Sequence, residues 1–125
     1  MELHDKLKAL AGILLIVSAI THVAQLFVYG FEGHVIGAAL YGSTYLILGI
    51  LLIKYPKNKL ISVIGAVHPA IGGILGTNRL ITYYIQATGD INYFIVFHIM
   101  VDVIVVSICI YSLVKLRKQE QNIQG

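Results

Sequence analysis

The chain has 125 residues, of which 58% are hydrophobic and 12% charged, and its formal net charge is +3. Because soluble globular proteins contain about 25% charged residues, this composition excludes an ordinary soluble domain and predicts a membrane protein. The single cysteine, Cys109, has no partner for an internal disulfide and falls within the last apolar segment, so it says nothing about the redox compartment.

The first apolar segment follows Lys6 and Lys8 and extends to about residue 30. Two lysines before an apolar run also begin a secretory signal peptide, but this run is longer than a usual signal core and no small-residue cleavage site ends it. We therefore predict a helix of the mature protein over residues 7–30.

Three further apolar segments follow, and each is close to the ~20 residues that a helix needs to cross the hydrocarbon. Such continuous runs differ from the ~10-residue alternating strands of a transmembrane barrel. The predicted fold class is all-α: a polytopic membrane protein with one domain over residues 1–125, in which four transmembrane helices form an up-and-down bundle with short loops. The three further helices are predicted over residues 34–54, 59–85 and 91–116.

The basic residues predict the orientation of the bundle. Of the nine Lys and Arg residues, all except Arg79 fall before the first helix, in the second connection or after the fourth helix. The positive-inside rule places that side in the cytoplasm, so we expect a multi-pass protein of the cell membrane with both termini cytoplasmic. The other connections, which carry Glu32 and Asp90, would lie outside. His4 precedes the first predicted helix, and we expect it in solvent, without a role.

Topology and attraction to anionic membrane lipid account for the basic excess, so no nucleic-acid partner is expected. Small residues one helical turn apart are expected to let helices approach closely, because lipid gives helices no hydrophobic reason to associate. The pairs Gly33 with Gly37 and Gly72 with Gly76 are the predicted contact points.

Four ionisable residues fall inside the predicted helices: His22, His68, His98 and Asp102. Counted at ~1.5 Å per residue from the outer helix ends, all four lie between the outer interface and roughly the midplane. An aspartate at that depth costs roughly 2.5 to 3.5 kcal/mol even on the mildest scale, so it should face a partner or a water-filled space. Because the four residues come from three helices, one polar cavity in the outer half is predicted, to which Tyr41, Thr44 and Tyr45 would add the contribution of the second helix.

The leading functional hypothesis is a cofactor site for membrane electron transfer. Imidazoles from two helices suit a b-type haem in a four-helix bundle, so His22 and His98 are predicted as axial ligands, with His68 as a substitute for either. Arg79, with His34 or Tyr83, would meet the haem propionates. The same histidines with Asp102 form the alternative, a site for a transition-metal ion such as copper, zinc or iron.

Other functions stay open at this stage. The polar set is also compatible with a hydrogen-bonded core without chemistry, with a small proton or ion carrier, with a lipid-modifying enzyme, or with a non-catalytic subunit of a larger membrane complex. The expected partners are membrane lipid, a quinol or another redox partner, and further copies of the chain or the other subunits of such a complex. No diagnostic spacing such as HExxH, CxxC or CxxCH is present to select among these functions.

Overall fold

A computed structural model of the chain describes residues 2–86, 89 and 91–125, and within that part the fold is entirely helical. Each of its four helices is long and apolar enough to cross a membrane, which confirms the predicted all-α class. Asp90 and most of the predicted outer connection before it lie outside the described residues. The helices are α1 (Leu3–Tyr29), α2 (Gly33–Lys54), α3 (Lys59–Gln86) and α4 (Tyr93–Gln124).

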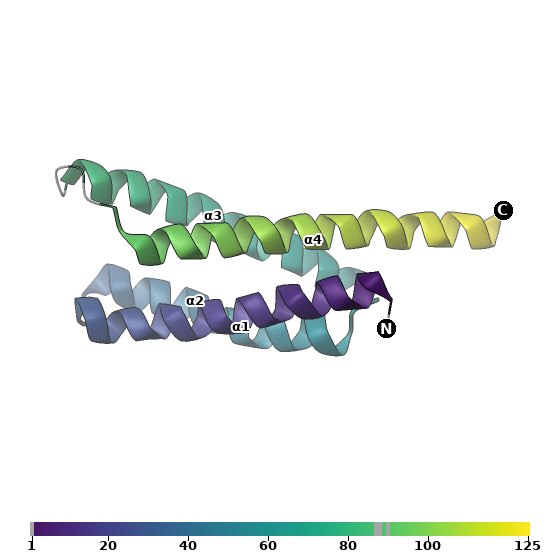
Figure 1. Cartoon of the computed structure of the whole chain (residues 1–125), viewed down its shortest axis with the longest axis horizontal. Helices are drawn as coiled ribbons and strands as arrows, with labels where there is room; N and C mark the ends of the chain where they lie inside the picture. The colour runs from purple at the N-terminus through teal and green to yellow at the C-terminus, as the bar shows by residue number, and fades with distance from the viewer. Residues whose placement is uncertain (1, 87–88, 90) are drawn as a thin grey trace.

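The helices form two antiparallel hairpins that lie side by side (Figure 1). Helix α1 packs closely along α2, and α3 packs closely along α4, whereas the hairpins meet mainly through α1 and α4 and only sparsely through α2 and α3. Both termini and the α2–α3 connection lie at one end, here called the terminal end. The α1–α2 connection, the end of α3 and the start of α4 lie at the other end, here called the hairpin end.

Two helix ends differ from the predicted ones by more than two residues. Helix α1 begins at Leu3, so it includes His4, and α4 continues past residue 116 to Gln124. The apolar count could not detect either extension, because both consist of polar and charged turns that lie beyond the hydrophobic runs. The start of α1 matters for the interior, because it places His4 on the same face as Lys8.

The interior is narrow and the outer surface is apolar. Leu15, Leu52 and Val105 are completely buried between the helices, whereas large side chains such as Phe27 and Ile74 point outward and are more than two-thirds exposed. A surface of this kind is typical of a bundle that packs in lipid.

Glycines set the spacing within the first hairpin. A Cβ on Gly12 would lie 2.5 Å from the carbonyl oxygen of Gly49, and a Cβ on Gly49 would lie 2.6 Å from that of Gly12, so the two backbones touch at this level. The predicted contact pair of Gly33 with Gly37 is wrong, because nothing lies within 4 Å of a Cβ at either position. The spacing rule found small residues but could not tell which helix face has a neighbour.

The terminal end encloses a polar cluster, and here the expectation for His4 is wrong. His4 is 2% exposed and Lys8 is 0% exposed. Lys8 Nζ donates to Ser62 Oγ at 2.5 Å, and Ser112 Oγ lies 2.7 Å from His4 Nε2. His4 and Lys8 extend the buried face of α1 toward its start. The same helical spacing connects Lys8 with Leu15 in the sequence.

Candidate functional site

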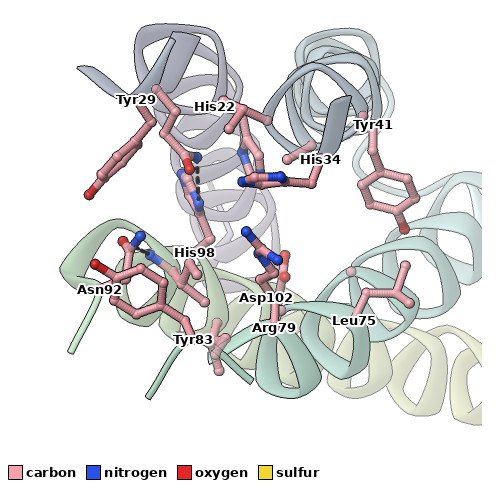
Figure 2. Close-up of a pocket in the computed structure, with 18 of the residues that line it drawn as sticks. His22, Tyr29, His34, Tyr41, Leu75, Arg79, Tyr83, Asn92, His98 and Asp102 are labelled. Carbon is pink, nitrogen blue, oxygen red and sulfur yellow. Dashed lines mark hydrogen bonds between the residues drawn. The ribbon is translucent and has the colours of Figure 1, made fainter. Parts of the chain in front are cut away.

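A cavity of about 690 Å³ lies between the four helices in the half of the bundle nearer the hairpin end. Its polar lining comes from every helix, as Figure 2 shows for His22, His34, Arg79 and Asp102. Its walls are apolar side chains of α2, α3 and α4, which include Val35, Ala38, Leu75, Ile95 and Ile99. An apolar chamber with a few convergent polar groups is the usual form of a small-molecule site.

His22 and His98 meet face to face across the α1–α4 interface. Their ring centroids are 3.6 Å apart and their planes are 14° from parallel, which is van der Waals contact between stacked rings. The structure thus brings together the two histidines that the sequence predicted as a pair, but with one ring directly on the other.

The hydrogen bonds of His98 use both of its ring nitrogens. Thr21 donates its hydroxyl hydrogen to a carbonyl of its own helix, that of Ser18 at 2.9 Å or that of Val17 at 3.1 Å. His98 Nε2–H therefore donates to Thr21 Oγ1, at 2.8 Å, and the amide of Gln25 donates to His98 Nδ1 at 3.4 Å. No lone pair of His98 is left over for a ligand.

His22 is held differently. Its Nδ1–H donates to the backbone carbonyl of Ser18 at 2.8 Å, so its Nε2 carries a lone pair and no hydrogen. No described residue donates to that Nε2, and the side chain lines the cavity. Metal-ligating histidines commonly have this arrangement, in which one nitrogen is fixed by a carbonyl and the other is available. Gly42 makes room for the ring, because a Cβ there would collide with it.

The floor of the cavity is formed by Tyr45 and Asp102. The Tyr45 hydroxyl donates to Asp102 Oδ1 at 2.8 Å, and both side chains are nearly completely buried. Gly72 lies against the pair, because a Cβ there would fall on the Tyr45 hydroxyl and 3.2 Å from Asp102 Oδ2. Asp102 has the partner that its depth requires, and that partner is the hydroxyl of a tyrosine.

His68 lies apart from the other two histidines. Tyr45 separates it from His22, with ring centroids 5.4 Å from His68 and 5.9 Å from His22. The hydroxyl of Thr44 donates to the carbonyl of Tyr41 at 2.6 Å, so His68 Nε2–H donates to Thr44 Oγ1, at 2.7 Å. His68 is not among the residues that line the cavity.

The mouth of the cavity is at the hairpin end. Arg79 lies seven residues, or roughly 10 Å, along α3 from Gly72 at the floor, and Figure 2 shows its guanidinium pointing into the space between the helices. Tyr83 and His34 lie nearby. None of the ion pairs between described residues includes Arg79, so its charge is available to an anionic group that enters the cavity.

The separation of His68 bears on the choice of cofactor. In the described part of the chain, no three His, Cys, Asp or Glu side chains gather closely enough to hold a metal ion. A pair of axial ligands has the iron between the two nitrogens, roughly 2 Å from each, whereas His22 and His98 are stacked ring on ring. Of the predicted axial pair, only His22 can offer a nitrogen to a metal centre in the cavity as the two rings lie.

Comparison with protein-family models, with curated protein sequences and with solved structures found no match for this chain. The site is therefore interpreted from its own geometry.

Sequence reasoning missed Thr21 as a partner of His98 and did not assign the group that donates to Asp102. Thr21 lies three residues after Ser18 and four before Gln25, on one face of α1 with them, so helical spacing could have identified it. Its hydroxyl lies 2.8 Å from His98 Nε2. Tyr45 was predicted as part of the cavity, since a deep tyrosine needs a partner for its hydroxyl, but only the packed structure shows that the partner is Asp102.

Proposed function

We propose that this protein binds haem b in the cavity at the hairpin end, with Nε2 of His22 as the axial ligand, and that it serves in membrane electron transfer. The observation that supports the proposal is the state of His22, whose Nδ1–H is bonded to the Ser18 carbonyl while Nε2 keeps a lone pair at the cavity wall. Haem b proteins can hold iron through a single proximal histidine.

A haem suits this cavity better than an isolated metal ion. A bare zinc or copper ion in a protein takes three or four protein ligands, and no three His, Cys, Asp or Glu side chains of the described residues gather closely enough to supply them. A porphyrin supplies four nitrogens itself, so one imidazole is sufficient. The apolar side chains of Leu75, Ile95 and Ile99 would contact the macrocycle, and Arg79 with His34 at the mouth would pair with the propionates.

The proposed orientation follows from charge. All Lys and Arg residues other than Arg79 belong to the terminal end, so the positive-inside rule places that end with both termini in the cytoplasm and the mouth of the cavity outside. Electrons would then be exchanged with a quinol in the bilayer or with a redox partner on the outer side. The accessory-subunit and ion-carrier alternatives stay predictions, since neither requires His22 to keep a lone pair toward the cavity.

The test is the absorption spectrum of the protein purified in detergent from a host supplied with haem precursor. We expect a Soret band, and sharp α and β bands after reduction. His22→Ala should lose the bands, and His22→Gly should recover them when imidazole is added to the buffer, because free imidazole fits the space that the side chain leaves. A recovery of this kind also shows that the variant is folded.

Two matched histidine variants act as controls. His98→Ala should keep the haem, because both nitrogens of His98 already have partners within the bundle, and His34→Ala should at most weaken its retention. A colourless wild-type protein from the haem-supplied host, or an unchanged spectrum in His22→Ala, would overturn the proposal.

A further inference from the structure

Asp102 can be approached from a second side, through a groove on the outer surface of the bundle. This groove, of about 550 Å³, lies between α3 and α4 and includes outward-facing apolar side chains such as Ile74 and Val103. Asp102 lines both this groove and the central cavity. Because the bundle surface here is apolar, the groove faces lipid when the helices span a membrane.

Gly73 opens the groove toward the carboxylate. A Cβ at Gly73 would lie 3.4 Å from Asp102 Cβ and 3.8 Å from Oδ2, so any larger side chain would occupy the space in front of the carboxyl group. Asp102 is 4% exposed, and Tyr45 donates only to its Oδ1. No described residue donates to Oδ2, and no fully enclosed side-chain oxygen of the described residues lacks a partner, so Oδ2 is an accessible acceptor without a donor.

Two hydroxyls of the groove are also acceptors, and Asn78, which lines it as well, adds a side-chain amide with both donors and an acceptor. Thr77 donates its hydroxyl hydrogen to the carbonyl of Gly73 at 2.8 Å, and Ser107 donates its own to the carbonyl of Val103 at 2.7 Å. Each hydroxyl oxygen keeps lone pairs but has no hydrogen left to donate. An apolar molecule that carries hydrogen-bond donors therefore matches Asp102 and these two hydroxyls from the lipid side.

We propose that the groove between α3 and α4 is a lateral binding site for a quinol, with Asp102 Oδ2 as acceptor for one of its hydroxyl groups. A quinol is lipid-soluble and has donors at opposite ends of one ring, whereas the corresponding quinone has acceptors only. Asp102 lies at the level of Gly73, and Thr77 is four residues, or ~6 Å, further along α3. Thr77 Oγ1 accepts from the second hydroxyl.

The groove would be the place where the electron donor of the proposed function binds. Only the role of the bound quinol as electron donor rests on the proposed haem. Quinol binding itself needs the groove and Asp102, so it can be measured whether or not the purified protein contains haem. The central cavity and the groove can also be blocked separately. Gly37 lines the cavity, and a Cβ added there would have nothing within 4 Å, whereas Gly73 lines the groove.

The experiment is calorimetric titration of the full-length protein in lipid nanodiscs with a short-chain hydroquinone under reducing conditions, with its quinone, and with its dimethyl ether. A hydrogen bond to an otherwise unpaired acceptor is sufficient for about a tenfold difference in affinity, so the hydroquinone should bind about tenfold more tightly than either analogue. Thr77→Val should weaken its binding several-fold.

Gly73→Leu should abolish hydroquinone binding, and Gly37→Leu, the same substitution in the central cavity, should leave it unchanged. Asp102→Asn should remove the preference of the hydroquinone over its dimethyl ether. Equal affinity for the dimethyl ether, unchanged binding in Gly73→Leu, or loss of binding in Gly37→Leu alone would each overturn the proposal. Haem absorbance of the same samples is read separately, so a colourless protein that still binds hydroquinone refutes the haem proposal and not the groove.

Discussion

Gly49→Ala tests the close approach of α1 and α2. A Cβ at this position would lie 2.6 Å from the carbonyl oxygen of Gly12, about 0.8 Å short of the 3.4 Å at which ordinary contact begins. The obstacle is backbone and cannot rotate away, so the two helices have to separate by most of that difference. Overpacking of this kind costs about 1 to 3 kcal/mol, and lipid provides no hydrophobic force to restore the contact.

The free energy of unfolding can be measured by titrating the protein with SDS in mixed micelles and following helicity and fluorescence from its tyrosines. Gly37→Ala is the matched control, because the same methyl group is added to the same helix where nothing lies within 4 Å. We expect Gly49→Ala to lower the free energy of unfolding by about 1 to 3 kcal/mol, and Gly37→Ala to leave it unchanged or raise it slightly.

Gly12→Ala adds a second check on the same contact. Its Cβ would meet the carbonyl oxygen of Gly49, so one separation of the helices relieves both substitutions. The double variant should therefore be less destabilised than the sum of the single variants. Equal stability of Gly49→Ala and Gly37→Ala would show that α1 and α2 do not touch at this level, and the packing argument would be wrong.

Three further predictions concern the interior and the orientation. Tyr45→Phe should lower the free energy of unfolding by about 1 to 3 kcal/mol, because it removes the donor to a buried carboxyl group. In a double-mutant cycle with Asp102→Asn, the coupling energy between the two residues should be about 0.6 to 1.7 kcal/mol. A coupling energy of zero would contradict the hydrogen bond between them. Lys8→Met should raise the free energy of unfolding or leave it unchanged, because a buried cation is replaced by an apolar chain of similar length. Ser62 keeps its hydrogen bond to the Asn58 carbonyl. A clear loss of stability in the SDS titration would mean that the amine of Lys8 is needed. In whole cells, a membrane-impermeant maleimide should label His34→Cys but not Lys118→Cys, and the reverse pattern would invert the proposed orientation.

The helices themselves follow directly from the order of residues along the chain. Long apolar runs between charged residues can satisfy their backbone groups in lipid only as helices, so the four elements and their approximate ends were predictable. The same runs hid the polar extensions of α1 and α4, where hydropathy changes but the helix continues.

The candidate site was predictable in its members more than in its arrangement. Helical periodicity places His22 on one face with Ser18 and Gln25. The free-energy cost of an aspartate inside a membrane implies a partner for Asp102. What periodicity cannot supply is the rotation of each helix against its neighbours, and this rotation decides that His98 stacks on His22 while Tyr45 lies between His22 and His68.

The sequence by itself determined four apolar helices, a basic end and a set of ionisable residues buried at similar depth, because each of these depends only on composition and on position along a helix. Tertiary packing decided which of the polar groups share a cavity, that one histidine nitrogen keeps its lone pair, and that Lys8 is enclosed. These depend on contacts between helices, where glycines at Gly12, Gly42 and Gly49 fix how closely and at what rotation the backbones meet.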